Sequence, residues 1–187
     1  SSLKHRNQMY HPGLGLPENL WASHDPEEVL RGAESVIRAI PSQTVRENLT
    51  LWRDYIEPDA LLVTLMKGIE QGTKLRMSQV LAEVADIPID RVAVVSGPNL
   101  AREIIQRQPA ATTVACVDEK RSQQLQQASA NDYFRPYFTT DVVGTEIGGA
   151  VKNVIALANG MAVGQGFGEN AQAALITRGL AEMSRLG

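Results

Sequence analysis

The sequence predicts an α/β fold, a doubly wound and mostly parallel sheet that is followed by a purely helical segment. Short, near-continuous apolar runs recur along the first 140 residues, and segments of helical length separate them, which is typical of strands buried on both faces. After Thr140 no strand pattern appears and the apolar character becomes continuous. We therefore expect two parts, residues 1–140 and residues 141–187.

The first part of the chain opens with alternating strand and helix candidates. Asp25 can cap a helix that has proline at its first position, and Ser42 can cap another. Pro41 ends one apolar run, because proline cannot continue a strand ladder. The expected elements are a strand at 19–23, a helix beginning at Asp25–Pro26, a strand at 35–40, a helix from Ser42 to about Tyr55 and a strand at 61–65.

The alternation continues to residue 138. The run at 92–96 is wholly apolar up to its last residue and ends in Gly97–Pro98, which favours a buried strand followed by a turn. Pro136 places the last strand at the edge of the sheet, since it lacks a backbone N–H. The expected elements are helices at 74–84, 99–106 and 118–130 and strands at 92–96, 111–117 and 134–138.

The helical segment begins with a long apolar helix, Asp141 to Ala162, which carries one cation, Lys152. A lysine on an apolar helix face loses solvation, and this lowers its pKa toward a range useful for proton transfer. A glycine-rich break at 163–170 separates it from a second helix at 171–187. Two helices cannot bury both faces alone, so we expect them to pack on the sheet, on further chain or on a second subunit.

Composition excludes several classes of function. The 187 residues are 43% hydrophobic and 21% charged, and a net charge of −3 gives no footprint for nucleic acid or an anionic membrane. A single cysteine, Cys116, provides no disulfide framework and favours a reducing compartment. No signal segment is recognised at the N-terminus, and polar residues interrupt the apolar run at 147–163, so we expect a cytoplasmic protein without a membrane span. His5, His11 and His24 lack metal-ligand spacing and are expected at the surface, with no metal site.

Three loops follow predicted strands and are expected to meet at one edge of the sheet, where open α/β sheets bind ligands. They are Pro41–Thr44, Met66–Gly68 and Ser96–Asn99. The first offers hydroxyl and amide groups, the second a cation, and the third backbone N–H groups at a helix start. Together they favour a site for a phosphorylated ligand and a cofactor.

Each candidate also has a structural interpretation. Lys67 could be a solvated loop lysine, and Lys152 could reach solvent or pair with Glu146, although six residues do not place the two on one helical face. Arg178 is expected to pair with Glu182, four residues later. No GxGxxG motif lies between a strand and a helix, so we expect the dinucleotide-type sheet to be incomplete.

Four stretches carry a resemblance to a known family: LMKGIEQGT (65–73), VVSGPNLAREI (94–104), VVGTEIGGAVKNVIALANGMAVG (142–164) and GFGENAQAALITRGLAEMSRLG (166–187). They resemble the bacterial NAD(P)-dependent sn-glycerol-3-phosphate dehydrogenases, in their actinobacterial form. The resemblance runs from about Asn7 onward. It implies an incomplete Rossmann-like domain, without its first phosphate-binding turn, and the first helices of a substrate and dimerisation domain.

The resemblance implies a reversible hydride transfer between a nicotinamide and C2 of glycerol 3-phosphate or dihydroxyacetone phosphate, supplying glycerophospholipid synthesis. NAD(H) or NADP(H) is the implied cofactor, and a homodimer the implied assembly. By matching motifs, Lys152 is the implied general acid/base and Asn153 orients the substrate, while Lys67 touches substrate and cofactor. The remaining matched positions are Gly97 and Asn99 for substrate, and Ala101 and Thr44 for cofactor.

Two matched positions depart from the usual pattern of the family. Many bacterial members have threonine where this chain has Asn99, and an aromatic ring is common where it has Thr44. Two other functions stay open: a related two-domain dehydrogenase of the 6-phosphogluconate or 3-hydroxyacid type, and an inactive fragment that serves only as a binding or dimerisation module. The preference between NADH and NADPH depends on a strand end that is not recognised in this sequence.

Overall fold

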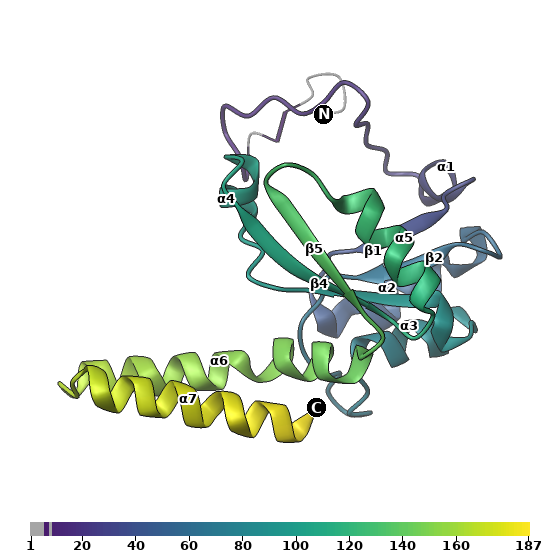
Figure 1. Cartoon of the computed structure of the whole chain (residues 1–187). Helices are drawn as coiled ribbons and strands as arrows, with labels where there is room; N and C mark the ends of the chain where they lie inside the picture. The colour runs from purple at the N-terminus through teal and green to yellow at the C-terminus, as the bar shows by residue number, and fades with distance from the viewer. Residues whose placement is uncertain (1–5, 8) are drawn as a thin grey trace.

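A computed structural model describes residues 6, 7 and 9–187. Its centre is one five-stranded sheet in the order β1-β2-β3-β4-β5. Figure 1 shows the sheet above the long helices α6 and α7. All neighbouring strands are parallel except β3 and β4, which are antiparallel. The strands are β1 (Ser35–Arg38), β2 (Leu61–Thr64), β3 (Val92–Ser96), β4 (Ala110–Cys116) and β5 (Phe134–Thr139).

Seven α-helices connect and follow the strands in the described chain. They are α1 (Pro26–Leu30), α2 (Val45–Trp52), α3 (Met77–Ala85), α4 (Ala101–Ile105), α5 (Glu119–Ser129), α6 (Val142–Gly164) and α7 (Glu169–Leu186). Short 3₁₀ turns flank α2 and precede β3. The predicted fold class, a mostly parallel α/β sheet followed by helices, is confirmed.

The main core lies between the sheet and the pair α2 and α3. Leu49 of α2, Leu62 of β2 and Leu81 of α3 are fully buried there. β2 is buried at every position, which explains why it reads as a continuous apolar run rather than an alternating one. Cys116 belongs to a second cluster with Val63 and Ala93, and burial raises the pKa of its thiol.

Most predicted elements are present, with small shifts at their ends. Asp25 caps α1 by accepting a hydrogen bond from the backbone N–H of Glu27, as expected. Ser42 does not cap α2; it begins a 3₁₀ turn, and α2 starts at Val45. The strand predicted at 19–23 is wrong, because the described chain provides it with no partner strand and its apolar side chains are exposed.

Residues 141–187 form an antiparallel helical hairpin of α6 and α7 that extends from beneath the sheet (Figure 1). Asp141 caps α6 through the backbone N–H of Gly144. The two helices approach closely where Gly179 faces Ile155, since a Cβ at that glycine would lie 2.8 Å from the isoleucine side chain. The predicted ion pair between Arg178 and Glu182 is present at 2.9 Å.

The exposed hairpin surface is strongly apolar. Val154, Leu157 and Met161 are 68%, 67% and 59% exposed. By length and composition α6 is also the one helix, in the part of the chain that is described, that could cross a membrane, although soluble core helices pass the same test. His24 is exposed, as expected, and His11 is partly exposed; His5 lies outside the described residues.

Candidate active site

The three loops that follow β1, β2 and β3 meet at one edge of the sheet, as the sequence predicts. Gln43 joins the first two loops: its side-chain N–H donates to the carbonyl of Ile69 at 2.9 Å, and its carbonyl accepts from the N–H of Gln71 at 2.9 Å. Lys67 joins the second loop to the third, because its Nζ donates to the carbonyl of Gly97 at 3.2 Å. The loops therefore form a connected rim at the carboxyl ends of three strands.

A cleft of about 370 Å³ lies between this rim and the first turns of α6. Lys67 and Lys152 line it from opposite elements, a loop after β2 and a helix. The other lining residues are Ser96, Gly97, Pro98, Thr113, Gly144, Thr145, Gly148, Gly149 and Met183. Two ammonium groups with no carboxylate in the lining make this a cleft for an anionic ligand.

Partial burial lowers the pKa of Lys67, and the charge of Lys152 lowers it further. Both causes favour the neutral form of Lys67, while a bound anion would favour the charged form. Lys152 donates to the side-chain carbonyl of its neighbour Asn153 at 3.0 Å, and both residues are exposed. Because Lys152 is exposed, the expected loss of solvation on an apolar helix face is not seen.

Gly149 allows α6 to lie against the rim. A Cβ at this position would lie 2.8 Å from the hydroxyl of Ser96 and 3.5 Å from the side chain of Lys67. Any larger residue must therefore displace the helix or the Ser96 hydroxyl. Gly160 of the same helix provides a comparison, because a Cβ added there would have no neighbouring atom within 4 Å.

We expect Gly149→Ala to lower the free energy of unfolding by about 1–3 kcal/mol, the usual cost of overpacking. Gly160→Ala is the matched control and is expected to raise it by about 0.5–1 kcal/mol, because alanine loses less backbone entropy in an exposed helix. Urea unfolding of both variants measures the two values. Equal effects at the two positions would contradict the close approach at Gly149.

Three of the matched positions, Asn99, Ala101 and Thr44, lie outside the cleft of the two lysines. Asn99 and Ala101 line a separate, mostly apolar cavity of about 390 Å³ on one face of the sheet. The side-chain N–H of Asn99 donates to the Thr112 hydroxyl at 2.9 Å, but its buried carbonyl oxygen has no hydrogen-bond partner in the described chain. Thr44 is exposed, and its hydroxyl donates to the carbonyl of Pro41 at 2.9 Å.

Glu146 is not the partner of Lys152. Its carboxylate is 4% exposed and contacts Arg76 and Ser78, at the start of α3. The alternative interpretation of Lys152 as one half of a Glu146 pair is therefore wrong. Both lysines remain available to a ligand in the cleft.

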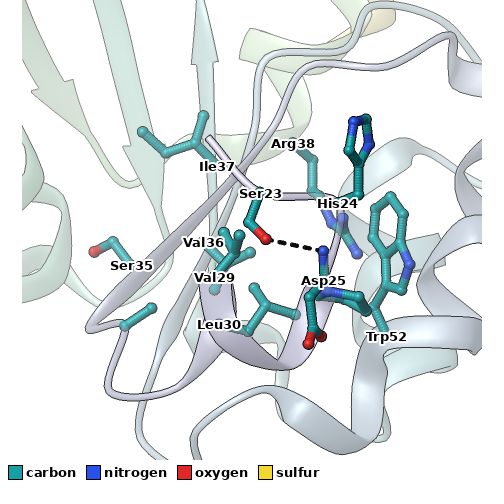
Figure 2. Close-up of a pocket in the computed structure, with 12 residues that line it drawn as sticks. Ser23, His24, Asp25, Val29, Leu30, Ser35, Val36, Ile37, Arg38 and Trp52 are labelled. Atoms are coloured by element: carbon teal, nitrogen blue, oxygen red, sulfur yellow. Dashed lines mark hydrogen bonds between the residues drawn. The ribbon is translucent and has the colours of Figure 1, made fainter. Parts of the chain in front are cut away.

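A third cavity, of about 300 Å³, lies beside β1 and α1 (Figure 2). Arg38 is buried there and stacks on the Trp52 ring, with 4.4 Å from its guanidinium carbon to the ring centroid. Burial lowers the pKa of Arg38, and its Nε and Nη2 have no hydrogen-bond partner among the described residues. This cavity contains none of the residues that the sequence analysis selected, and it is separate from the cleft of the two lysines.

Sequence reasoning missed several residues of the cleft. Thr113, Thr145 and Met183 are ordinary polar or apolar residues in the sequence, and only the fold brings them together. Gly149 could have been found, because paired glycines in a long helix indicate a close approach. Across the ranges 6–7 and 9–187, no group of three or more histidine, cysteine, aspartate or glutamate side chains is placed to hold a metal ion.

Comparisons with known proteins agree on one family. Residues 2–122 match the family model "NAD-dependent glycerol-3-phosphate dehydrogenase N-terminus", and residues 141–187 match the corresponding C-terminus. A glycerol-3-phosphate dehydrogenase (NAD(P)+) of Streptomyces griseus is 57% identical over 183 residues, and one of Corynebacterium glutamicum is 60% identical over 183 residues. These matches cover 98% of this chain but 54% and 55% of the relatives, so the chain spans about half their length.

Solved structures give the same answer. Glycerol-3-phosphate dehydrogenase of Coxiella burnetii superimposes with a TM-score of 0.86 at 35% identity, covering 99% of this chain and 56% of that one. The Saccharomyces cerevisiae enzyme gives a TM-score of 0.89 at 30% identity, covering 100% and 55%. A pyrroline-5-carboxylate reductase of Coxiella burnetii, at 11% identity and a TM-score of 0.50, shares the fold alone.

Proposed function

Because the chain belongs to the NAD-dependent glycerol-3-phosphate dehydrogenase family, we propose that it carries the central part of an active site for reversible hydride transfer. The substrate pair is glycerol 3-phosphate and dihydroxyacetone phosphate, and the reaction occurs at C2. The observation that carries the proposal is the convergence of Lys67 and Lys152 on one cleft at the carboxyl edge of the sheet. A small substrate with a phosphate dianion suits this paired positive charge.

The cofactor in this proposal is NAD(H) or NADP(H), which supplies or accepts the hydride when it is bound. The described residues fit such a group. The cavity beside the rim has a mostly apolar lining, and Asn99, whose buried carbonyl oxygen has no hydrogen-bond partner in the described chain, belongs to that lining. Thr44, Lys67 and Ala101 are the proposed cofactor contacts, all near the edge at which parallel sheets bind dinucleotides.

Lys152 is the proposed general acid/base. It protonates the C2 oxygen as the carbonyl is reduced and takes the proton back in the reverse direction, so that no free alkoxide has to form. Asn153 holds the Lys152 ammonium through its side-chain carbonyl and thereby directs it. Lys67, held by the carbonyl of Gly97, stabilises negative charge on the substrate and contacts the cofactor. Gly97 and Asn99 complete the proposed substrate contacts.

The same proposal extends to the organisation of the protein. Residues 1–140 are the cofactor-binding part and residues 141–187 belong to a helical substrate and dimerisation part. The exposed apolar surface of α6 and α7 supports a homodimer or further helices that cover it. A cytoplasmic location and a role in glycerophospholipid synthesis follow from the proposed reaction.

Substrate specificity tests the proposal against its alternatives. We suggest a hybrid in which this chain replaces the matched 183 residues of the Streptomyces griseus relative, assayed beside the 187-residue chain itself. The expected result for the hybrid is oxidation of NADH or NADPH with dihydroxyacetone phosphate, and no reduction of NAD+ or NADP+ with 6-phosphogluconate or 3-hydroxyacids. Preference for either alternative substrate refutes the proposed one. If the hybrid turns over and the 187-residue chain does not, the 187 residues are not an enzyme by themselves.

A further inference from the structure

Glu146 joins the helical hairpin to the sheet-bearing part of the chain. One carboxylate oxygen accepts the backbone N–H of Ser78 at 2.7 Å, and the other accepts the Ser78 hydroxyl at 2.6 Å and the Arg76 guanidinium at 2.5 Å. The glutamate side chain is 4% exposed and that of Arg76 is 19% exposed. The contact spans 68 to 70 residues of sequence, so it is a tertiary contact and not a local one.

The geometry is that of a helix cap supplied by another helix. Ser78 is the second residue of α3, where backbone N–H groups lack intrahelical partners and a negative charge is favourable. Glu146 supplies both the acceptor and the charge, and Arg76 balances the charge. Since α3 is fixed in the main core through Met77 and Leu81, the cap ties α6 to the most rigid part of the molecule.

Besides this cap, α6 packs on α7 and on β3 and β4 of the sheet. Among its buried residues only Val142 and Glu146 lie in the part that meets the sheet, and the distal part of the helix is largely exposed. Residues on a helix are separated by about 100° and about 1.5 Å, so Lys152 lies about 9 Å beyond Glu146 and about 120° around the axis. Gly149 falls between them and faces Ser96 and Lys67. A rotation of α6 about its axis would therefore carry Lys152 out of the cleft.

We propose that Glu146 is a positioning residue, which caps α3 from α6 and thereby holds Lys152 opposite Lys67 across the cleft. The predicted effect on turnover rests on the proposed function, whereas the positioning of Lys152 does not. The geometric effect can be measured without turnover, through the titration of Lys67. Loss of the cap is expected to move Lys152 away from Lys67. The charge of Lys152 would then lower the pKa of Lys67 less.

The sign of this change separates positioning from direct electrostatics. Removing the negative charge of Glu146 would by itself disfavour the charged form of Lys67 and lower its pKa further. Displacement of Lys152 acts in the opposite direction and raises it. An upward shift after Glu146→Gln therefore reports movement of the helix, whereas an unchanged or lower pKa of Lys67 would show that Glu146 does not hold Lys152 in position.

The experiment uses the hybrid protein, with lysine side chains labelled by ¹³C and the Lys67 resonance assigned by Lys67→Arg. Glu146→Gln keeps an acceptor for the Ser78 N–H, and Ser78→Ala removes the hydroxyl contacts with Glu146 and Arg76 but keeps the backbone N–H contact, so the second variant is the milder of the two. Glu182→Gln is the matched control, because it removes an ion-paired glutamate on α7 that contacts only Arg178 and Arg185. We expect Glu146→Gln to raise the pKa of Lys67 and to lower kcat about 10-fold or more, since a displacement of 1 Å can cost about 100-fold.

Each outcome decides one of the two proposals. An upward pKa shift in a hybrid without dehydrogenase turnover supports the positioning role and sinks the proposed reaction. A hybrid that turns over, with kcat and the pKa of Lys67 the same in Glu146→Gln as in the parent, overturns the positioning role. Equal effects of Glu146→Gln and Glu182→Gln overturn it as well, because the second residue does not join the hairpin to the sheet.

Discussion

Lys152→Ala is expected to lower kcat for dihydroxyacetone phosphate reduction by at least about 100-fold, the usual contribution of a positioned general acid. The KM for the nicotinamide should change little, because the Lys152 side chain lines the cleft and its ammonium donates a hydrogen bond to Asn153. Steady-state kinetics of the hybrid protein measure both constants. Circular dichroism should show an unchanged fold, since Lys152 is exposed.

Lys120→Ala is the matched control for this substitution. Lys120 is an exposed lysine on α5, far in sequence and in the fold from the cleft, and its side chain makes no hydrogen bond in the described chain. Its replacement should leave kcat within the error of the assay. If Lys152→Ala retains near-normal kcat, Lys152 is not the acid/base and the mechanism proposed for the cleft is wrong.

Lys67→Met is expected to lower kcat/KM for dihydroxyacetone phosphate by about 100-fold or more, because it removes the cation that stabilises negative charge on the substrate. Both lysines face one cleft, so the loss should appear in the KM for the substrate as well as in kcat. Lys67→Met preserves the length and the apolar stem of the side chain. A loss confined to protein stability, with normal kinetics in the folded fraction, would contradict this role.

The pH dependence of kcat/KM gives a second check on Lys67. Burial and the charge of Lys152 lower the pKa of Lys67, so its cationic form is lost at a lower pH than that of an exposed lysine. As pH rises through this lowered pKa, kcat/KM should fall, before the range in which ordinary lysines titrate. Lys67→Arg should move the fall to higher pH, since arginine stays charged. A profile that is the same in both proteins would assign the fall to another group.

The sequence was sufficient for most of the sheet. β3 has the predicted bounds, 92–96, because a wholly apolar run between turn residues has few alternatives. The strand expected at 19–23 failed because a strand is defined by a neighbour, and periodicity contains no information about whether a neighbour exists. The helix at 74–84 begins three residues later than expected, at Met77, after a backbone turn in which Lys74 has a positive φ.

The candidate site was predicted in outline and not in its supporting contacts. Lys67, Gly97 and Lys152 share one cleft because strand ends and one helix converge, which topology and motif together anticipate. Asn99 and Ala101 lie in a neighbouring cavity, a division that depends on which face of the sheet each loop residue meets. Glu146 was considered only as a local partner of Lys152, because nothing in the sequence connects it to Arg76, 70 residues earlier.

Isotope transfer tests the central claim most directly. The hybrid protein would be supplied with dihydroxyacetone phosphate and a reduced nicotinamide that carries deuterium at its transferable hydride position, and the product analysed by mass spectrometry and NMR. The account predicts glycerol 3-phosphate with one deuterium, located at C2. A product with deuterium elsewhere or with none, or a correctly folded hybrid that forms no product with either nicotinamide, would contradict it.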